Sequence, residues 1–474
     1  MYEIKISVRN LVEFIMRSGD LSVSSTGLKD ANAMQEGTRI HKKLQRKAGA
    51  GYHAEVALSH TSEVTYDGLT FQITVEGRAD GIYSDELGWN IDEIKGIYRD
   101  IHTLSEAIPV HRAQALCYGL IYALQNTLDG IGIRITYCHI PTEEVRYFHE
   151  FISFAELQNW YDTLLASYAK WASWHIRWQE ERNNNIKSLE FPFSYRDGQN
   201  TLVKGVYQSI LRKKRLYIEA PTGVGKTIST IFPAVKSLGE NVSEKIFYLT
   251  AKTITRTVAE DTLFLLQEKK VPLKSVTLTA KEKICFLEKP ACNPAQCDYA
   301  KGHFDRVNDA VFDLLTHETI MTRETILEYA KKHIVCPFEM ALDTATWCDF
   351  IIGDYNYAFD PTASLKRFFS VDKENNFVFL IDEAHNLVER ARTMYSADLY
   401  KEDVLAVKKK VKNTAPKLAK KLEECNKQFL ALKRECEDCQ ILNSVSHVYL
   451  KLLNLVTEMD HFLEDCKDET LVLF

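Results

Sequence analysis

Apolar and polar positions along the first 185 residues predict a mixed α/β domain. Strand-like segments at 71–83 and 89–95 flank a turn-forming stretch at 84–88, so we expect them to pair as a hairpin. A further strand is expected at 131–140. The expected helices span 36–45, 103–127 and 152–182, with a short helix or a strand–helix start at 5–17.

The rest of the chain contains short apolar runs that are typical of buried parallel strands. Such runs are Leu216–Ile218, the start of 245–253, and 376–381. The polar, Asn-rich stretch 181–188 predicts a domain boundary before them. Beyond residue 396, Leu and Val recur at three- and four-residue steps, which predicts helices that pack by one face.

Composition narrows the class of protein. The 474 residues carry a formal net charge of −6, so any nucleic-acid contact must come from local basic patches. We find no secretory signal and no apolar run near the ~18 residues of a membrane span, which predicts a cytoplasmic protein with no membrane partner. The eleven cysteines are too dilute for a disulfide scaffold, so clusters among them favour metal binding.

A glycine loop follows the apolar run at 216–218. Gly223 and Gly225 allow backbone N–H groups to face a phosphate chain, Lys226 reaches the terminal phosphates, and Thr227 offers a hydroxyl to Mg²⁺. This is the P-loop pattern, except that its first glycine is Ala220. An ordinary strand-to-helix turn is the alternative. The remaining candidates for ATP contact in the loop are Pro221, Thr222 and Val224.

A second acidic motif lies far downstream of the loop. The apolar run at 376–381 ends in Asp382-Glu383-Ala384-His385. Asp382 is placed to hold Mg²⁺, directly or through water, and Glu383 to polarise the attacking water of phosphoryl transfer. An apolar strand that ends in Asp-Glu occurs by chance, but the combination with Gly-Lys-Thr predicts an ATPase site.

Three charged positions in the hairpin could perform metal-dependent chemistry. Glu93 and Lys95 lie two residues apart, so they share one face of a strand, while Asp80 lies on the neighbouring strand and Asp92 faces away. Two carboxylates can hold Mg²⁺ or Mn²⁺, which lowers the pKa of a bound water. Solvated hairpin charges are the alternative.

Four cysteines lie between the two ATPase motifs. Cys285, Cys292, Cys297 and Cys336 are separated by six, four and thirty-eight residues, and paired Cys-x-x-Cys knuckles are absent. Irregular spacing and a Cys-Pro ending suit a 4Fe–4S cluster, with zinc as the alternative. Cys436 and Cys439 are interpreted as a helix surface feature, and Cys117, Cys138 and Cys348 as core.

The order of these motifs resembles the iron–sulfur helicases of the DinG/XPD family, a DEAH-type branch of superfamily 2. The resemblance implies a RecA-like lobe with a cluster insert, and adenine recognition by Gln199. It also implies that His385 couples the nucleotide to the DNA side. Single-stranded DNA would then be bound by Thr250, Lys252 and Thr253.

The N-terminal motif resembles the PD-(D/E)xK nucleases of the RecB-like branch, with Asp80 and Glu93-Ile94-Lys95 as the matching residues. Two further features of that branch are present. His41 lies on an early helix, where histidine can complete a metal shell. Gln114 and Tyr118 form a Gln-x-x-x-Tyr element and project from one helical face.

These resemblances imply an α/β protein with five regions. Its function would be an ATP-dependent DNA helicase with a nuclease domain, acting on single-stranded or branched DNA in repair or replication. Without a second helicase lobe, supplied downstream or by another chain, we expect ATP binding with poor hydrolysis. The alternatives are a non-catalytic ATP- and DNA-binding module, or a nuclease regulated by an incomplete motor. The regions are a nuclease domain at 1–185, lobe 1 at 190–280 and 341–395, a cluster insert at 281–340, and arch-like helices at 396–474.

Overall fold

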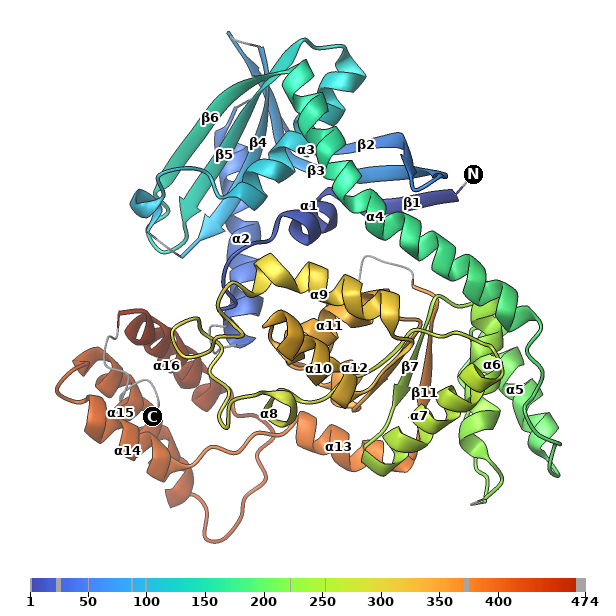
Figure 1. The fold of residues 1–474 in the computed structure, drawn as a ribbon. Coiled ribbons are helices and arrows are strands. Elements are labelled where there is room, and N and C mark those ends of the chain that lie inside the picture. Colours follow the sequence, from blue (N-terminus) through green and yellow to red (C-terminus); the bar gives the residue numbers. More distant parts are fainter. Residues whose placement is uncertain are drawn as a thin grey trace. The chain divides into compact units, whose positions relative to one another are not determined.

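The computed structural model describes residues 2–22, 27–49, 51–86, 88–98, 100–221, 223–251, 253–369 and 375–465. They form two compact units, Met1–Val388 and Glu389–Phe474, and each unit is described by itself. The first unit contains two β-sheets with their covering helices (Figure 1).

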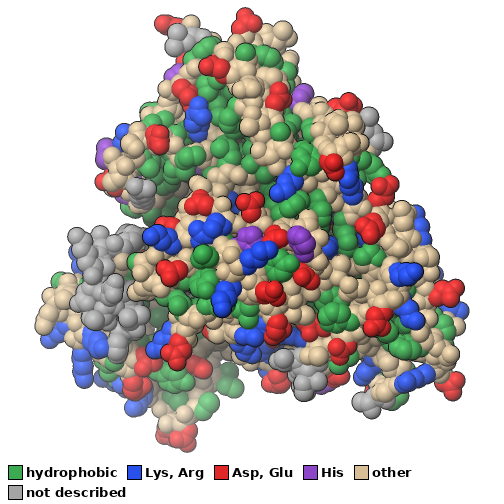
Figure 2. Space-filling view, in the orientation of Figure 1, with side chains coloured by type: hydrophobic (Ala, Val, Ile, Leu, Met, Phe, Trp, Pro, Cys, Tyr) green, Lys and Arg blue, Asp and Glu red, His purple; other side chains and the backbone are tan. Residues whose placement is uncertain are grey.

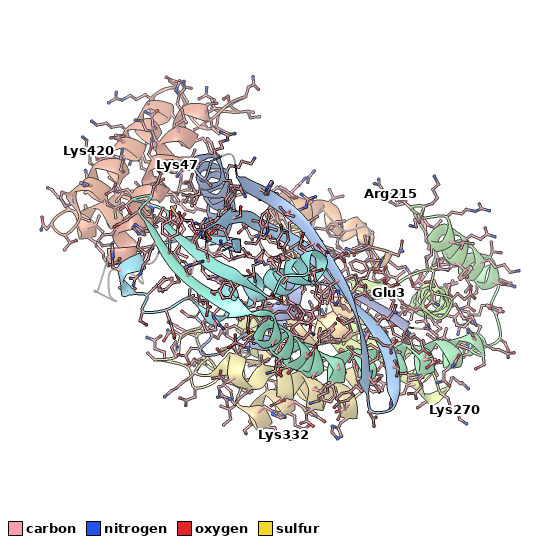
Figure 3. The ribbon with its side chains drawn as sticks, turned by 90° about the horizontal axis from the view of Figure 1, so that it is seen from above. Glu3, Lys47, Arg215, Lys270, Lys332 and Lys420 are labelled. Atoms are coloured by element: carbon pink, nitrogen blue, oxygen red, sulfur yellow. The ribbon has the colours of Figure 1, made fainter. Side chains whose placement is uncertain are left out.

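A six-stranded sheet organises the N-terminal part of the first unit. Its order is β1-β3-β4-β5-β6, and β2 pairs with β3 outside this path. The predicted hairpin is confirmed, because β3 and β4 pair in antiparallel register across the expected turn. Figure 3 shows β2 and β3 side by side as a long ribbon, with Lys47 at the end of α2 nearby. The strands are β1 (Tyr2–Ser7), β2 (Tyr52–Tyr66), β3 (Leu69–Asp85), β4 (Gly88–Ile97), β5 (Gly130–His139) and β6 (Val145–Ser153).

The helices of this part lie where the sequence pattern predicted them, with shifted ends. The helix expected at 103–127 is shorter, because a 3-10 turn η1 (Ile101–Thr103) and a loop precede Pro109, which occupies the first helical turn where its missing N–H costs nothing. The helices are α1 (Val8–Met16), α2 (Gly27–Lys47), α3 (Pro109–Asn126) and α4 (Phe154–Lys187).

Helix α4 joins the two parts of the unit and corrects the predicted linker. It begins at a capping box of Ser153 and Glu156 and continues through the Asn-rich stretch 181–188 to Lys187. Figure 1 shows it as one long helix that starts beside the first sheet and ends beside α5 and α6. Ile186, near its end, is fully buried in the core of the second sheet's lobe. The polar stretch is therefore helix, because its apolar positions have a core to pack against.

The second sheet has five parallel strands in the order β11-β7-β10-β8-β9. This confirms the predicted parallel sheet. Strand β7 is buried throughout, whereas β11 ends the sheet and its Phe379 is 41% exposed. The 376–381 run is therefore an edge strand rather than a fully buried one. The strands are β7 (Lys245–Leu249), β8 (Ser275–Thr277), β9 (Ile320–Met321), β10 (Phe350–Gly353) and β11 (Phe377–Ile381).

The region predicted as an insert, 281–340, contains one strand of the second sheet. Strand β9 lies within this region and pairs with β8, so the region is not one continuous segment outside the sheet. The elements between and around these strands are α5 (Gln199–Leu211), α6 (Lys226–Gly239), α7 (Thr253–Glu268), α8 (Lys281–Ile284), α9 (His303–His317), α10 (Arg323–His333), α11 (Pro337–Trp347), α12 (Asn356–Phe359) and η2 (Ala384–Asn386).

The second unit is helical, as the Leu and Val periodicity predicted. After α13 (Leu387–Met394), which spans the boundary between the units, it contains α14 (Lys401–Val411), α15 (Pro416–Arg434) and α16 (Ser446–Asp465). Leu418, Leu422 and Leu455 pack in its core. The prediction for Cys436 and Cys439 is wrong, because both follow the end of α15 and lie in the loop before α16. By contrast, Cys117, Cys138 and Cys348 are buried as predicted.

The distribution of charged side chains on the surface agrees with the formal net charge of −6. On the face shown in Figure 2, Lys and Arg side chains are interspersed with Asp and Glu, and no extended basic surface is visible on that face. In the part of the chain that the structure describes, no helix is both long and apolar enough to cross a membrane.

Candidate nucleotide and metal sites

The glycine loop leads directly into α6. Gly223 and Gly225 have φ values of +84° and +80°, a backbone region that favours glycine, and Gly225 precedes the first residue of the helix. Lys226 therefore begins α6, where N–H groups without helical partners can bind an anion. Its Nζ donates to the Ala220 carbonyl oxygen at 3.3 Å, so the lysine folds back over the loop.

Gln199 holds the loop from the start of α5. Only 3% of this residue is exposed. Its Nε2 donates to the Val224 carbonyl oxygen at 3.1 Å, and its Oε1 accepts from the Arg196 backbone N–H at 3.1 Å. Arg196 in turn donates to the Gly223 carbonyl oxygen. Both residues therefore fix the loop conformation, and Arg196 is a contact that the sequence motif did not single out.

The Asp-Glu-Ala-His segment lies against the same loop. Lys226 Nζ and Glu383 Oε1 are 4.0 Å apart, and His385 Nδ1 is 3.4 Å from Glu383 Oε2. Glu383 has a φ of +51°, an uncommon conformation for a non-glycine residue and one that is enriched at functional sites. Residues 157 positions apart in the chain are thus brought together because β11 ends at this edge of the sheet.

Tyr248 connects the two residues that were predicted to hold Mg²⁺. Burial and the charge of Asp382 raise the pKa of this buried tyrosine on β7, and the nearby Thr227 side chain lowers it. Burial raises the pKa of Asp382, and its interaction with Tyr248 lowers it. The Tyr355 hydroxyl donates to the backbone carbonyls of Asp382 and Glu383. Tyr248 lies in the strand that the sequence predicted at the start of 245–253, but no sequence motif assigned a role to either tyrosine.

The buried strand predicted at Leu216–Ile218 is not formed. These residues are extended without a strand partner, and Tyr217 is 87% exposed. They line one wall of a cleft of about 1220 Å³, whose opposite wall includes Phe377 and Phe379 of β11. An apolar run becomes a buried strand only beside another strand, and among the described residues none lies between this run and β11.

The residues predicted to contact DNA are placed only in part. Thr250 follows β7, is 1% exposed, and shares a hydrogen bond with the Thr255 hydroxyl. Thr253 begins α7. Lys252, and Thr222 of the glycine loop, lie outside the described residues.

The structure brings together the predicted residues of the metal site in the first sheet. His41 Nδ1 is 3.3 Å from Asp80 Oδ1, and the other Asp80 oxygen accepts from the Ile94 N–H at 2.8 Å. Lys95 Nζ is 2.7 Å from Glu93 Oε1, as expected for two residues on one face of a strand. Asp92 points to the other face, where it accepts from Arg134 and Thr136.

The pKa values of Glu93 and His41 at this site are shifted from their usual values. Burial and the nearby Asp80 charge raise the pKa of Glu93. Burial alone would lower the pKa of His41, but its hydrogen bond to Asp80 and the charge of that carboxylate raise it. Shifted pKa values of this kind are common where several carboxylates lie together at a binding site for a cation. Gln114 and Tyr118 are both buried on α3, and the charges of Glu93 and Asp80 act on the Tyr118 hydroxyl.

All four predicted cluster ligands are free and partly exposed thiols. Cys336 is the N-cap residue of α11 without a side-chain capping hydrogen bond, and burial raises the pKa of its thiol to about 11. Within the described ranges, no three of the four sulfur atoms come within 4.8 Å of one another.

Parts of the chain are similar to known proteins. Residues 266–404 match the family model described as DEAD_2. A Caenorhabditis briggsae protein, "Regulator of telomere elongation helicase 1 homolog", is 24% identical over 261 residues, 46% of this chain and 26% of that protein. The Saccharomyces cerevisiae "General transcription and DNA repair factor IIH helicase subunit XPD/RAD3" is 30% identical over 112 residues, 24% of this chain and 14% of that protein.

Both of these relatives carry the word helicase in their names. The chain spans about a quarter of the length of the first curated relatives that it matches. A solved chain named "XPD_Helicase" is 18% identical and covers 57% of this chain and 48% of its own length, with a TM-score of 0.35.

Proposed function

We propose that this chain combines the first lobe of an ATP-dependent DNA helicase with a metal-dependent DNA nuclease domain, and acts on single-stranded or branched DNA in repair or replication. The observation that supports the helicase part is the distance of 4.0 Å between Lys226 Nζ and Glu383 Oε1, together with the hydrogen bond by which Gln199 holds the glycine loop. The DEAD_2 match and the helicase relatives support the same assignment.

In the nucleotide site, each residue has a role that follows from its place. The loop N–H groups and Lys226 bind the phosphates of ATP, while Thr227 and Asp382 would hold Mg²⁺ beside them. Glu383 orients the attacking water. His385, 3.4 Å from Glu383, is placed to connect hydrolysis to the DNA side.

In the nuclease site, Asp80, Glu93 and His41 would hold a divalent cation, which supplies Lewis-acid chemistry when bound. Lys95 balances the charge of Glu93 and lies where it could face the scissile phosphate. Tyr118 and Gln114 support the site from α3.

Cys285, Cys292, Cys297 and Cys336 would hold a 4Fe–4S cluster. In the chain itself, the Phe286 and Tyr299 rings already connect the first and third cysteine loops, with centroids 4.3 Å apart. The cluster would tie these loops to the start of α11.

Two paired assays test the proposal. This chain should hydrolyse ATP only slowly, and somewhat faster when single-stranded DNA is added. Lys226→Ala should remove this slow activity, whereas Lys420→Ala, on an exposed position of the second unit, should not. The chain should also cut DNA with Mn²⁺ or Mg²⁺. Asp80→Asn should abolish cutting without changing ATP hydrolysis, and Glu76→Gln, exposed on the same strand, is the matched control. Equal cutting by Asp80→Asn would refute the nuclease assignment.

One observation favours a second candidate. Because residues 216–218 lie outside the sheet, the glycine loop lacks strand support on its N-terminal side. A module that binds ATP and DNA without hydrolysis would show nucleotide binding that depends on Lys226 but no turnover with any DNA.

A further inference from the structure

Glu55, which no motif identified, faces the predicted metal site across the sheet. On β2 and β3, Ala54 pairs with Gly81 and Val56 with Ala79, so Glu55 and Asp80 stand opposite each other. On the other side of β3, Gly81 pairs with Asp92, and the same register brings Glu93 next to Asp80. Three carboxylates therefore form a row across three strands. Like charges opposite each other destabilise a sheet unless a cation separates them.

The ligand atoms are close enough to share one ion. One atom each from His41, Glu55 and Asp80 lies within 4.8 Å of the others. Gln45 fixes this arrangement from α2, because its Nε2 donates both to Glu55 Oε1 at 3.0 Å and to the Asp80 backbone carbonyl at 2.9 Å. Gln45 thus holds Glu55 next to Asp80, whose Oδ2 accepts from the Ile94 N–H and whose Oδ1 lies 3.3 Å from His41 Nδ1.

An independent observation indicates a missing ligand at this place. Glu93 is 4% exposed, and its Oε2 has no hydrogen-bond partner among the described residues. A buried carboxylate oxygen without a partner is costly, and a cation would satisfy it. Glu55 itself has a φ of +55° in the middle of a strand, a conformation that persists only where its surroundings enforce it.

We propose that Glu55 is a metal ligand and that, with His41 and Asp80, it forms a site that prefers Mn²⁺ to Mg²⁺. The inference rests on the proposed nuclease function and adds a ligand and a metal preference to it. Magnesium favours an all-oxygen shell and keeps its waters, whereas an imidazole nitrogen suits transition metals. Glu55 contributes a negative charge from a third strand, so it should govern affinity rather than only orientation.

Binding of Mn²⁺ alone, followed by the electron paramagnetic resonance signal of the free ion, tests the proposal without any DNA. The wild-type chain should bind Mn²⁺ more tightly than Mg²⁺, which competes poorly. Glu55→Gln should weaken Mn²⁺ binding by about tenfold or more. Glu63→Gln, exposed on the same strand, should bind as the wild type does.

The variant Glu55→Gly distinguishes a metal-binding role of Glu55 from a purely structural role. Glycine adopts a positive φ without strain, so this variant should melt at a higher temperature than the wild type and still lose Mn²⁺ affinity. Unchanged Mn²⁺ affinity in Glu55→Gln and Glu55→Gly would overturn the proposal, and so would tighter binding of Mg²⁺ than of Mn²⁺. Failure of the nuclease function looks different: the wild-type chain binds Mn²⁺ through Glu55 but cuts no DNA.

Discussion

Arg182 on α4 and Asp349 before β10 form an ion pair in which both side chains are almost completely buried. Asp349 also accepts from the Trp178 indole N–H at 2.9 Å and from the Lys274 backbone N–H at 2.9 Å. The end of α4, which follows the six-stranded sheet, is therefore bound into the lobe that contains the glycine loop. A sequence boundary drawn at 181–188 passes through this contact.

Replacing Asp349 with Ala should destabilise the first unit by about 3–5 kcal/mol, because Arg182 would remain buried without its counter-charge. Urea unfolding followed by tryptophan fluorescence measures the change, since Trp178 lies in the same cluster. Asp67→Ala is the matched control. It removes an exposed ion pair with Arg177 on the same helix and should cost less than about 1 kcal/mol. A similar cost for both variants would show that the buried pair does not fix α4.

Acidification should destabilise the same region through His175. Burial lowers its pKa to about 4, and the charges nearest to it are those of Asp349, Lys245 and Arg182. The unfolded chain, with an ordinary pKa near 6.5, binds the proton first as the pH falls, so stability is complete above that value and is lost between about pH 6.5 and pH 4. From pH 7.5 to pH 5.0 the loss from this residue is about 2 kcal/mol.

Urea unfolding at the two pH values, compared between wild type and His175→Gln, isolates this contribution. The variant should lose about 2 kcal/mol less than the wild type over the same interval. Parallel losses in both proteins would assign the acid sensitivity to other groups.

Separate variants should distinguish nucleotide binding from hydrolysis. Lys226→Ala removes the cation that faces the phosphates and should weaken binding of a fluorescent ATP analogue by about tenfold or more. Glu383→Gln keeps the shape of the site and should bind ATP normally while losing turnover. Loss of binding in Glu383→Gln would mean that its contact with Lys226 organises the loop rather than the chemistry.

We expect Gln199 to hold the glycine loop in shape rather than to recognise the adenine base directly. Gln199→Glu places a carboxylate against the Val224 carbonyl oxygen, where an N–H now donates. ATP and GTP analogues should both bind about tenfold more weakly, because the whole loop is disturbed. A loss confined to ATP would instead support direct recognition of adenine.

Cysteine variants should reveal which thiols hold a metal centre. Anaerobically purified protein should contain about four irons per chain and absorb near 400 nm. Cys285→Ser should lose both signals. Cys436→Ser changes a thiol in the loop between α15 and α16 and should keep them. Stoichiometric zinc without iron would contradict the cluster assignment.

The sequence predicted those parts of the site that depend on spacing within one element. Glu93 and Lys95 share a face because strand side chains alternate, and Gln114 and Tyr118 share one because they are a helical turn apart. The hairpin turn then fixed the register that brings Asp80 beside Glu93. These relationships are local, so the period and the turn suffice to predict them.

Contacts that depend on tertiary packing could not be predicted from the sequence. Glu55 reaches the site only because β2 pairs with β3 in one register and because its backbone takes a left-handed conformation. Tyr248 joins Thr227 to Asp382 because β7 and β11 are neighbours. The opposite error occurred at Leu216–Ile218, where an apolar run predicted a strand that finds no partner.

Strand β11 has a consequence for handling the protein. Among the described strands β11 ends the sheet, beside the exposed Phe379, and residues 216–218, which line the same cleft, belong to no described strand. Such an edge is a template for strand addition between molecules. Concentrated preparations should therefore self-associate by intermolecular β-pairing at this edge, and a charged substitution such as Phe379→Lys should keep the protein monomeric for longer.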